Sequence, residues 1–153
     1  MNKVQKMCKQ AIIAAMYVAL CTINPLSFGT LQFRIANMLV ALPLLRKEYA
    51  PGVLLGIAIA NMTSPLGIYD VAFGLAAEGI AYALTVWGSC KKSPFAVKAA
   101  IVSLCVAVVI GIELNFTYHA PFVVTAAGLL VTTMIAVSAG YFVFAKTPLK
   151  KVL

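Results

Sequence analysis

Long apolar stretches separated by short polar loops organise the whole chain. They divide it into six segments, expected at about 10–22, 32–45, 51–62, 68–87, 96–116 and 121–144. Apolar stretches of this kind are typical of helices that lie in a lipid bilayer. The pattern predicts an all-α integral membrane protein, in which residues 1–153 form a single domain of six transmembrane helices.

The second and third segments are short for a full crossing. Each has only about 13 residues, so each helix would be about 20 Å long, whereas the hydrocarbon core is about 30 Å thick. A re-entrant hairpin is one alternative, but it would place Arg46, Lys47 and Glu48 inside the membrane at a high energetic cost. We therefore expect both segments to cross, helped by local thinning of the bilayer or by flanking polar turns.

The composition agrees with a membrane protein and excludes a soluble globule. The chain is 63% hydrophobic and 10% charged, with a mean hydropathy of +1.00, so it has too little polar surface to cover a soluble domain. A net charge of +8 would suggest nucleic acid as the partner of a soluble protein. Here the basic residues are spread over short loops without interleaved aromatic residues, so we expect no nucleic-acid partner.

The basic residues indicate how the helices are oriented. Eleven of the twelve fall in four short clusters: Lys3, Lys6 and Lys9; Arg46 and Lys47; Lys91, Lys92 and Lys98; Lys146, Lys150 and Lys151. Six crossings place all four on one side of the membrane, which the positive-inside rule identifies as the cytoplasm. Both termini, the basic stretches 1–9 and 146–153, are then cytoplasmic. The N-terminus also resembles a signal peptide, but we interpret it as a retained first helix.

Arg34 is the one basic residue that this topology leaves near the outer face. A cation in that position has two interpretations. Its side chain could snorkel to the outer lipid headgroups, or it could form an ion pair or contact a ligand within the helical bundle. We expect Arg34 to belong to a ligand site that opens outward.

Other polar residues join Arg34 in the outer half of the predicted topology. Three of the four acids and the only histidine are among them: Asn37, Asp70, Glu78, Glu113, Asn115, Tyr118 and His119. An ionisable side chain that faces lipid costs several kcal/mol, so such residues normally face a cavity or a partner. One outward-facing polar pocket would satisfy the whole group. An aromatic slot for a planar ligand would come from Phe33, Phe73, Phe116 or Tyr118.

Several of these residues also have a structural interpretation. Asp70 is expected to cap the start of the fourth helix in addition to any ligand role. Glu78 could pair with Arg34 or lie at a helix interface, and Asn37 could bond a neighbouring helix as well as a heterocycle. His119 lies in a short loop, where a solvated histidine is as plausible as a ligand-binding one.

The first helix carries a stripe of small residues, because Ala11, Ala15 and Ala19 recur every fourth position. Such a stripe lets another helix approach closely within lipid. The spacing alone fits a partner protein or an internal helix equally well.

No catalytic chemistry is evident in the sequence. It contains no glycine-rich phosphate-binding loop, no metal-binding pair of His and Glu on one helical face, and no plausible Ser-His-Asp set. The four cysteines show neither metal-ligand spacing nor a disulfide pattern. We expect neither an enzyme nor a bound metal or cofactor, and any uphill movement of a ligand would take its energy from a partner.

Several motifs, in one order, resemble the QueT family. They are Asn24-Pro25-Leu26-Ser27-Phe28-Gly29, Leu31-Gln32-Phe33-Arg34-Ile35, Leu42-Pro43, Pro51-Gly52-Val53-Leu54-Leu55-Gly56, Ala60-Asn61, Ser64-Pro65-Leu66-Gly67-Ile68-Tyr69-Asp70-Val71-Ala72-Phe73-Gly74 and Ile110-Gly111-Ile112-Glu113-Leu114. The resemblance is dense from Asn24 to Gly74 and thinner afterwards. This family consists of substrate-binding S components of energy-coupling factor (ECF) transporters, which are associated with precursors of queuosine.

The resemblance implies a six-helix S-component fold in a bacterial cell membrane, with an outward-facing site for a 7-deazaguanine-like ligand. It also implies docking onto a transmembrane coupling subunit that carries two cytoplasmic ATPases. The stripe of Ala11, Ala15 and Ala19 is similar to the surface through which S components meet that subunit. By the same resemblance, Glu113 would accept hydrogen bonds from the guanine-like edge of the ligand.

The sequence departs from the family pattern at three places. Asn37 stands where the family usually has an acid, and a Gly-Glu pair of the last helix is replaced near Val131-Thr132. Glu78 stands where a small or hydroxyl residue is usual. These departures leave open whether the ligand is an aminomethyl 7-deazaguanine, which would want a carboxylate near its cation, or a nitrile precursor or queuine.

Three other functions compete with this interpretation. The chain could be a small self-assembling secondary transporter, in which Glu78 and Glu113 carry protons. It could also be an S component for a different vitamin. A non-transporting accessory subunit of another membrane complex would likewise explain the alanine stripe.

Overall fold

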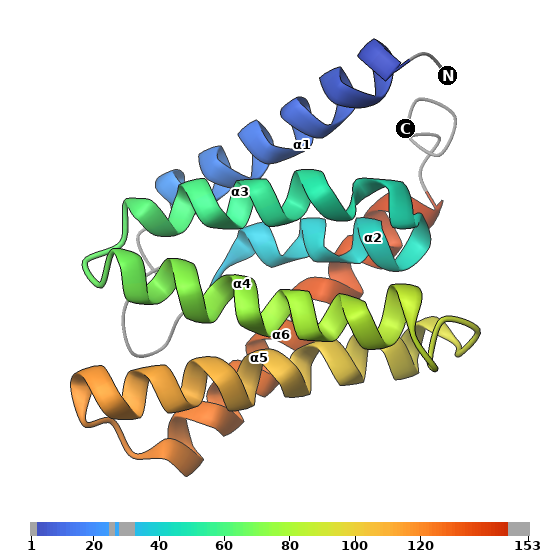
Figure 1. The fold of residues 1–153 in the computed structure, drawn as a ribbon. Helices are drawn as coiled ribbons and strands as arrows, with labels where there is room; N and C mark the ends of the chain where they lie inside the picture. The colour runs from blue at the N-terminus through green and yellow to red at the C-terminus, as the bar shows by residue number, and fades with distance from the viewer. Residues whose placement is uncertain (1–2, 25–26, 28–32, 147–153) are drawn as a thin grey trace.

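Six α-helices make up the computed structural model of this protein, which describes residues 3–24, 27 and 33–146; those residues contain no β-strand (Figure 1). The elements are α1 (Lys3–Ile23), the 3₁₀ helix η2 (Ile35–Val40), α2 (Ala41–Leu45), the 3₁₀ turn η3 (Lys47–Tyr49), α3 (Ala50–Met62), α4 (Ile68–Tyr82), the π-helical turn η4 (Ala83–Trp87), α5 (Phe95–Tyr118) and α6 (Phe122–Lys146). The predicted all-α class and the order of six helices are confirmed.

Four of the helical stretches are long and apolar enough to cross a membrane. They are Lys3–Ile23, Ile68–Trp87, Phe95–Tyr118 and Phe122–Ala145. Helix α1 begins about two turns before the expected start at residue 10, because the lysine-bearing N-terminal turns are helical as well. A multi-pass membrane protein is thereby established. Full crossing by the two shorter helices, α2 with η2 and α3, stays a prediction.

The short second helix lies inside the bundle. Helix η2 continues directly into α2, and together they contact α1, α3, α5 and α6 (Figure 1). Most side chains of this stretch are buried: Ala36, Asn37, Leu39, Val40, Ala41, Leu42, Pro43 and Leu44. Because a 3₁₀ helix rises about 2.0 Å per residue, η2 and α2 together are about 20 Å long. Protein rather than lipid covers this helix, so the bilayer thickness does not set its length.

Helices α1 and α3 approach closely because α3 presents glycine to α1. A Cβ atom on Gly56 would lie 2.7 Å from the Cβ of Tyr17, and one on Gly52 would lie 2.9 Å from the carbonyl oxygen of Gln10. Small residues at such contacts let two helical backbones approach within a membrane. The α1 side of this contact is therefore built from Gln10, Ala14 and Tyr17.

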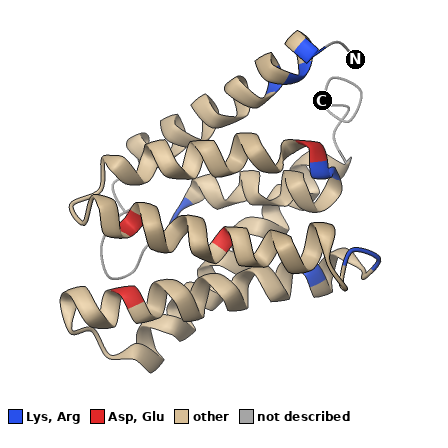
Figure 2. Cartoon of the chain, in the orientation of Figure 1, with Lys and Arg blue, Asp and Glu red and all other residues tan. Residues whose placement is uncertain are grey.

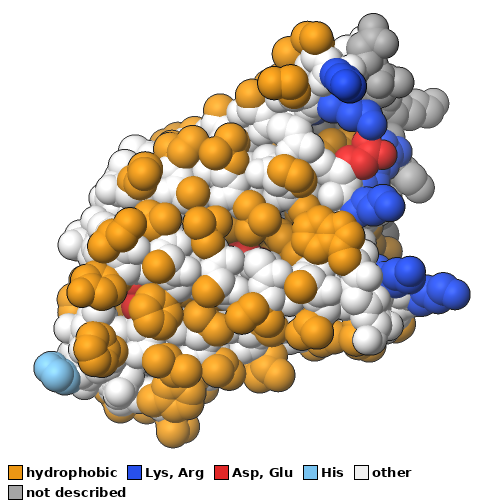
Figure 3. All heavy atoms as spheres, in the orientation of Figure 1, with side chains coloured by type: hydrophobic (Ala, Val, Ile, Leu, Met, Phe, Trp, Pro, Cys, Tyr) orange, Lys and Arg blue, Asp and Glu red, His pale blue; other side chains and the backbone are white. Residues whose placement is uncertain are grey.

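Charge is distributed asymmetrically along the bundle. In Figure 2 the blue Lys and Arg positions gather at the end where α1 and α3 begin and where η4 leads into α5, except for the one that precedes η2 inside the bundle. The pale blue histidine lies at the opposite end in Figure 3, and hydrophobic side chains cover much of the surface between the two ends. This arrangement agrees with the predicted clustering of basic residues on one side of the membrane. Lys150 and Lys151, which belong to the predicted basic C-terminus, lie outside the described residues.

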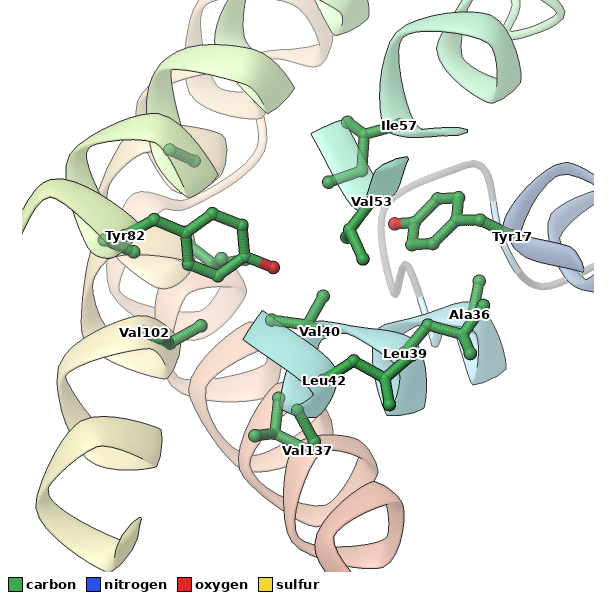
Figure 4. Packing of buried hydrophobic residues seen from close by; sticks show 14 of the residues in the cluster. Tyr17, Ala36, Leu39, Val40, Leu42, Val53, Ile57, Tyr82, Val102 and Val137 are labelled. Carbon is green, nitrogen blue, oxygen red and sulfur yellow. The ribbon is translucent and has the colours of Figure 1, made fainter. Parts of the chain in front are cut away.

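The core lies where the helices meet α2. Figure 4 shows Tyr17 of α1 and Tyr82 of α4 entering it from opposite sides, with their hydroxyl groups turned toward each other. Aliphatic side chains from five other elements fill the space around them: Leu39, Val40, Leu42, Val53, Ile57, Val102 and Val137. Two phenol groups thus end in an otherwise apolar interior, next to the polar residues described below.

Candidate ligand site

Arg34 lies inside the bundle immediately before η2, and its side chain does not reach toward the outer headgroups. Only 7% of the residue is exposed. Its Nε donates a hydrogen bond to the carbonyl oxygen of Ser27 (2.9 Å), and its Nη1 donates one to Oδ1 of Asn61 on α3 (3.0 Å). Its Nη2 lies 3.8 Å from Oδ1 of Asp70 on α4. The geometry therefore favours the ion-pair interpretation of Arg34 over snorkelling.

Asp70 completes this ion pair from the first turn of α4. It is 1% exposed, and its Oδ2 accepts a hydrogen bond from the hydroxyl of Ser64. The helix begins after Gly67, whose φ of 54° favours glycine, and no side chain caps its first turn. The expectation that Asp70 caps α4 is therefore wrong, because its carboxylate is turned toward Arg34 and Ser64 instead.

Asn61 on α3 links Arg34 to Asp70 on α4. Its side-chain oxygen accepts the hydrogen bond from Arg34, and its Nδ2 donates one to the backbone oxygen of Asp70 (2.7 Å). Gly74, one turn further along α4, leaves room for the Asn61 amide, which a Cβ atom there would displace. Helices α3 and α4 thus hold the guanidinium of Arg34 in one position through fixed, buried hydrogen bonds.

Glu113 lies on α5 beside this network and is completely buried. No N–H or hydroxyl group among the described residues donates a hydrogen bond to either of its carboxylate oxygens, and its side-chain hydrogen-bonding neighbour is the carboxyl group of Asp70. The charged groups that act on it are those of Asp70 and Arg34. Burying a carboxylate without such donors is costly, so Glu113 can accept further hydrogen bonds within this part of the bundle.

Glu78 lies two helical turns beyond Asp70 on α4 and is 5% exposed. Its Oε2 has no hydrogen-bond partner in the described part of the chain. It lines a small cavity of about 20 Å³. The other residues of this cavity are Tyr17, Arg34, Asn37, Ile57, Gly74, Ala77, Val106, Ile110, Leu129 and Thr133. A space of this size holds about one water molecule, so the site as described is closed and must widen to admit a heterocycle.

Asn37 belongs to the same cavity, where its Oδ1 accepts a hydrogen bond from the hydroxyl of Tyr17 (3.2 Å). It therefore links η2 to α1, which is the helix–helix role that the sequence left open beside ligand binding. Because the Tyr17 proton is donated to Asn37, the Tyr17 oxygen can accept a hydrogen bond, and Arg34 is a side-chain hydrogen-bond partner of Tyr17.

The remaining predicted site residues are less buried than those of the Arg34 network. Asn115 is exposed and donates a hydrogen bond to the carbonyl oxygen of Ala120 (2.8 Å), which closes the turn after α5. Tyr118 and Phe116 are exposed, and Phe33 is half-buried, with its carbonyl oxygen bonded to Asn24. His119 is exposed and ends α5 in a left-handed conformation. Ligand contact by these residues stays a prediction.

Tyr17 and Thr133 line the cavity but were not predicted as site residues, and the burial of Tyr82 in the adjoining core was not predicted either. The sequence does carry a signal for Tyr17, because Ile13, Tyr17 and Cys21 recur every fourth position on one face of α1 and are all buried. Nothing in the local sequence distinguishes Thr133 or Tyr82 from other residues of apolar helices, since their positions depend on how α6 and α4 pack around α2.

A bundle of apolar helices that encloses an ion pair and two unsatisfied carboxylates defines a multi-pass membrane protein with an internal polar site. Residues 7–147 match the family model of the QueT transporter, so the chain belongs to the QueT transporter family. This confirms the resemblance carried by the sequence motifs and makes the chain a transport protein rather than an enzyme. Neither the curated proteins nor the solved structures contained a match.

Proposed function

We propose that this chain is the substrate-binding S component of an ECF-type importer for a ligand of the 7-deazaguanine class. One observation carries the proposal: Arg34, Asp70 and Asn61 form a fixed buried network, beside which no N–H or hydroxyl group of the described residues donates to the buried Glu113 carboxylate. Buried acceptors of this kind are satisfied when a ligand brings N–H donors.

The guanine-like edge of a 7-deazaguanine has the matching chemistry. Its ring amide N–H and its exocyclic amino group are parallel donors, and a carboxylate such as Glu113 accepts such a pair with its two oxygens. Arg34 is held rigidly by its protein partners, so it can donate to a ligand carbonyl without reorganising. Glu113 would therefore accept hydrogen bonds from the base while Arg34 donates one to it, and together they would fix its orientation.

The coupling to ATP is assigned to partner subunits. The sequence contains no glycine-rich phosphate-binding loop, so the chain itself offers no nucleotide site. We place the transmembrane coupling subunit on the face of α1 formed by Ala11, Ala15 and Ala19. These three alanines are exposed and line an apolar groove of about 480 Å³ between α1 and α3, with Ala14, Val18, Leu55 and Ile59. A groove floored by alanine lets a partner helix approach closely.

Ligand binding and uptake with purified components test this proposal. The chain alone, reconstituted in nanodiscs, is expected to bind an aminomethyl or a nitrile 7-deazaguanine in a calorimetric titration. In liposomes it is expected to accumulate neither ligand until the coupling subunit, two ATPases and ATP are added. Concentrative uptake by the chain alone would overturn the proposal, and so would failure to bind any member of the class.

A proton-coupled secondary transporter is the second candidate. It is favoured by one observation, the two buried carboxylates of Glu78 and Glu113 with unpartnered oxygens in the described structure, since intramembrane acids are typical of proton relays. Such a protein would accumulate ligand in response to a pH gradient without any ATPase, and it would purify as a homo-oligomer.

A further inference from the structure

We propose that a groove between α2 and α6, at the basic end of the bundle, binds one anionic phospholipid, with its phosphate on Arg46 and an acyl chain in the groove. This lipid site is separate from the Arg34 network. Arg34 precedes η2 whereas Arg46 follows α2, so the two arginines lie about 20 Å apart along the bundle. The inference does not depend on which ligand the chain transports.

The groove exists because α6 continues past the point where α2 ends. The two segments are in close contact at Gly140, where an added Cβ atom would overlap the backbone of Met38. Helix α2 then ends at Leu45, and the chain turns away through Arg46, whose backbone is extended (φ −142°, ψ 110°). Helix α6 runs on to Lys146. The last turn of α6 therefore has no turn of α2 beside it, and a groove opens between them.

The walls of the groove are mostly apolar. Its volume is about 330 Å³, compared with about 20 Å³ for the cavity beside Glu78, so it admits a chain of atoms rather than a single water molecule. Tyr141 is fixed in one wall by stacking on Phe95 of α5, with ring centroids 4.2 Å apart. A preformed apolar slot removes an acyl chain from water and stabilises it there. The residues that line the groove are Leu42, Leu45, Arg46, Tyr49, Tyr141, Phe144 and Ala145.

Arg46 is the one charged residue among the described residues that line the groove. It is exposed, and its side chain makes no hydrogen bond or ion pair within the described part of the chain. The nearby acid Glu48 lines a different pocket, together with Lys6 and Lys9 of α1. The Arg46 guanidinium can therefore donate two parallel hydrogen bonds to the phosphate of a lipid.

The position of the groove along the bundle selects a lipid as its occupant. Most Lys and Arg positions gather at this end (Figure 2), which the positive-inside rule assigns to the cytoplasmic surface of the membrane. Tyrosines such as Tyr141 are typical of the level of the lipid headgroups, and the adjacent Phe142 and Val143 of α6 are exposed. Basic pockets between transmembrane helices at this level bind the headgroups of anionic lipids.

Lipid titration tests the charge preference. Delipidated protein in detergent is titrated with phosphatidylglycerol and with phosphatidylcholine of the same chain length, and bound lipid is counted by native mass spectrometry. Wild-type protein is expected to bind phosphatidylglycerol at least about fivefold more tightly. Arg46→Gln is expected to lose most of this preference, whereas Arg46→Lys keeps the charge and should retain most of it. Lys47→Gln is the matched control, because it removes the same charge from an exposed neighbour outside the groove.

A second substitution tests the slot for the acyl chain. Ala145 lines the groove, so Ala145→Trp fills it without changing the charge and is expected to weaken phosphatidylglycerol binding at least about fivefold. Val143→Trp, on an exposed residue of α6 outside the groove, is the control and should bind like wild-type protein. An excess of inorganic phosphate should not displace the lipid, because phosphate has no chain to occupy the slot.

Four outcomes would overturn the lipid site. The first is equal affinity of wild-type protein for the two lipids, a result that requires no variant to fold. Equal losses in Arg46→Gln and Lys47→Gln would assign the preference to the basic surface as a whole. Displacement of the lipid by inorganic phosphate would indicate a simple anion site. A lipid-free dimer that Ala145→Trp converts to a monomer would identify a second copy of the chain as the occupant of the groove.

Discussion

At the scale of single residues, the fork of the Arg34 guanidinium determines how the outer end of the site is organised. Its donors reach acceptors on three segments that are distant in the sequence: Ser27, Asn61 and Asp70. A planar group with donors in fixed directions can make these contacts at once, whereas a lysine ammonium is a point charge on a flexible stem. The shape of the arginine, beyond its charge, is therefore what the site uses.

Replacing Arg34 with lysine is expected to lower both ligand affinity and thermal stability. The substitution keeps the charge but leaves acceptors in the buried network without their donors, which costs about 1–3 kcal/mol. Calorimetric titration and thermal unfolding in detergent measure the two effects. Arg46→Lys, on an exposed residue at the basic end, serves as the control and should be silent. If Arg34→Lys also left ligand affinity and thermal stability unchanged, the result would contradict the network and favour snorkelling of Arg34.

Glu113→Gln is expected to weaken ligand binding at least about tenfold, which corresponds to about 1.4 kcal/mol. The amide keeps the shape of the side chain but offers only one acceptor oxygen to the paired donors of the ligand. Glu48→Gln is a matched control, because Glu48 is exposed and its contact with Gln10 uses the backbone oxygen. Equal affinities of the two variants in a titration of folded protein would contradict the assignment of the outer site.

The sequence predicted the ionisable residues of the site better than their hydrogen-bond partners. Arg34, Asp70 and Glu113 are recognisable because an ionisable residue in an apolar segment requires an explanation. The Arg34–Asn61 contact depends on the distance between η2 and α3, which no local pattern contains. Two departures from the family pattern, Asn37 and Glu78, line one cavity together with Thr133. The sequence does not show that these residues are neighbours, because η2, α4 and α6 come together only in the folded chain.

At the scale of elements, close packing of α1 on α3 depends on the missing side chains of Gly52 and Gly56. Replacing Gly56 with alanine is expected to destabilise the protein by about 1–3 kcal/mol, because the new methyl group would overlap the Tyr17 side chain and force the helices apart. Thermal unfolding in detergent measures the loss.

Gly79→Ala provides the matched control for that substitution. A Cβ atom at Gly79 would meet no atom within 4 Å, and alanine is more favourable than glycine inside a helix by up to about 1 kcal/mol. We therefore expect Gly79→Ala to be neutral or stabilising. A Gly56→Ala variant as stable as Gly79→Ala would show that α1 does not pack on α3 as described.

Element boundaries were predicted to within a few residues wherever loops are polar, since Lys91 and Pro94 or Asn61 and Pro65 interrupt the apolar pattern clearly. The 3₁₀ geometry of η2 was not predicted, and neither was the burial of α2 within the bundle. Hydropathy reports how apolar a segment is but does not report whether lipid or protein covers it. A short apolar helix is ambiguous for that reason until its neighbours are known.

At the scale of the whole molecule, three regions with different chemistry are separated. The Arg34 network is buried within the bundle, most of the Lys and Arg positions gather at one end of it (Figure 2), and Ala11, Ala15 and Ala19 line a groove together with residues of α3. The inner face of α1 is used by Tyr17 and Ala14, which contact α3. A partner could therefore bind to the groove or leave it without contacting the ligand site directly.

This separation predicts that docking can be lost while ligand binding is retained. Ala15 is exposed in the groove, so Ala15→Trp adds bulk where a partner helix would approach and leaves the core unchanged. Reconstituted uptake with the coupling subunit and its ATPases is expected to fall at least about tenfold, whereas the Kd for the ligand stays within about twofold.

Two variants serve as controls for Ala15→Trp. Adjacent Ala14 is 4% exposed, and Ala14→Trp should instead disrupt folding and binding together. Leu104→Trp, on the exposed face of α5, controls for an added tryptophan in lipid. If Ala15→Trp lowers affinity and uptake in parallel, the stripe packs within the chain and the partner docks elsewhere.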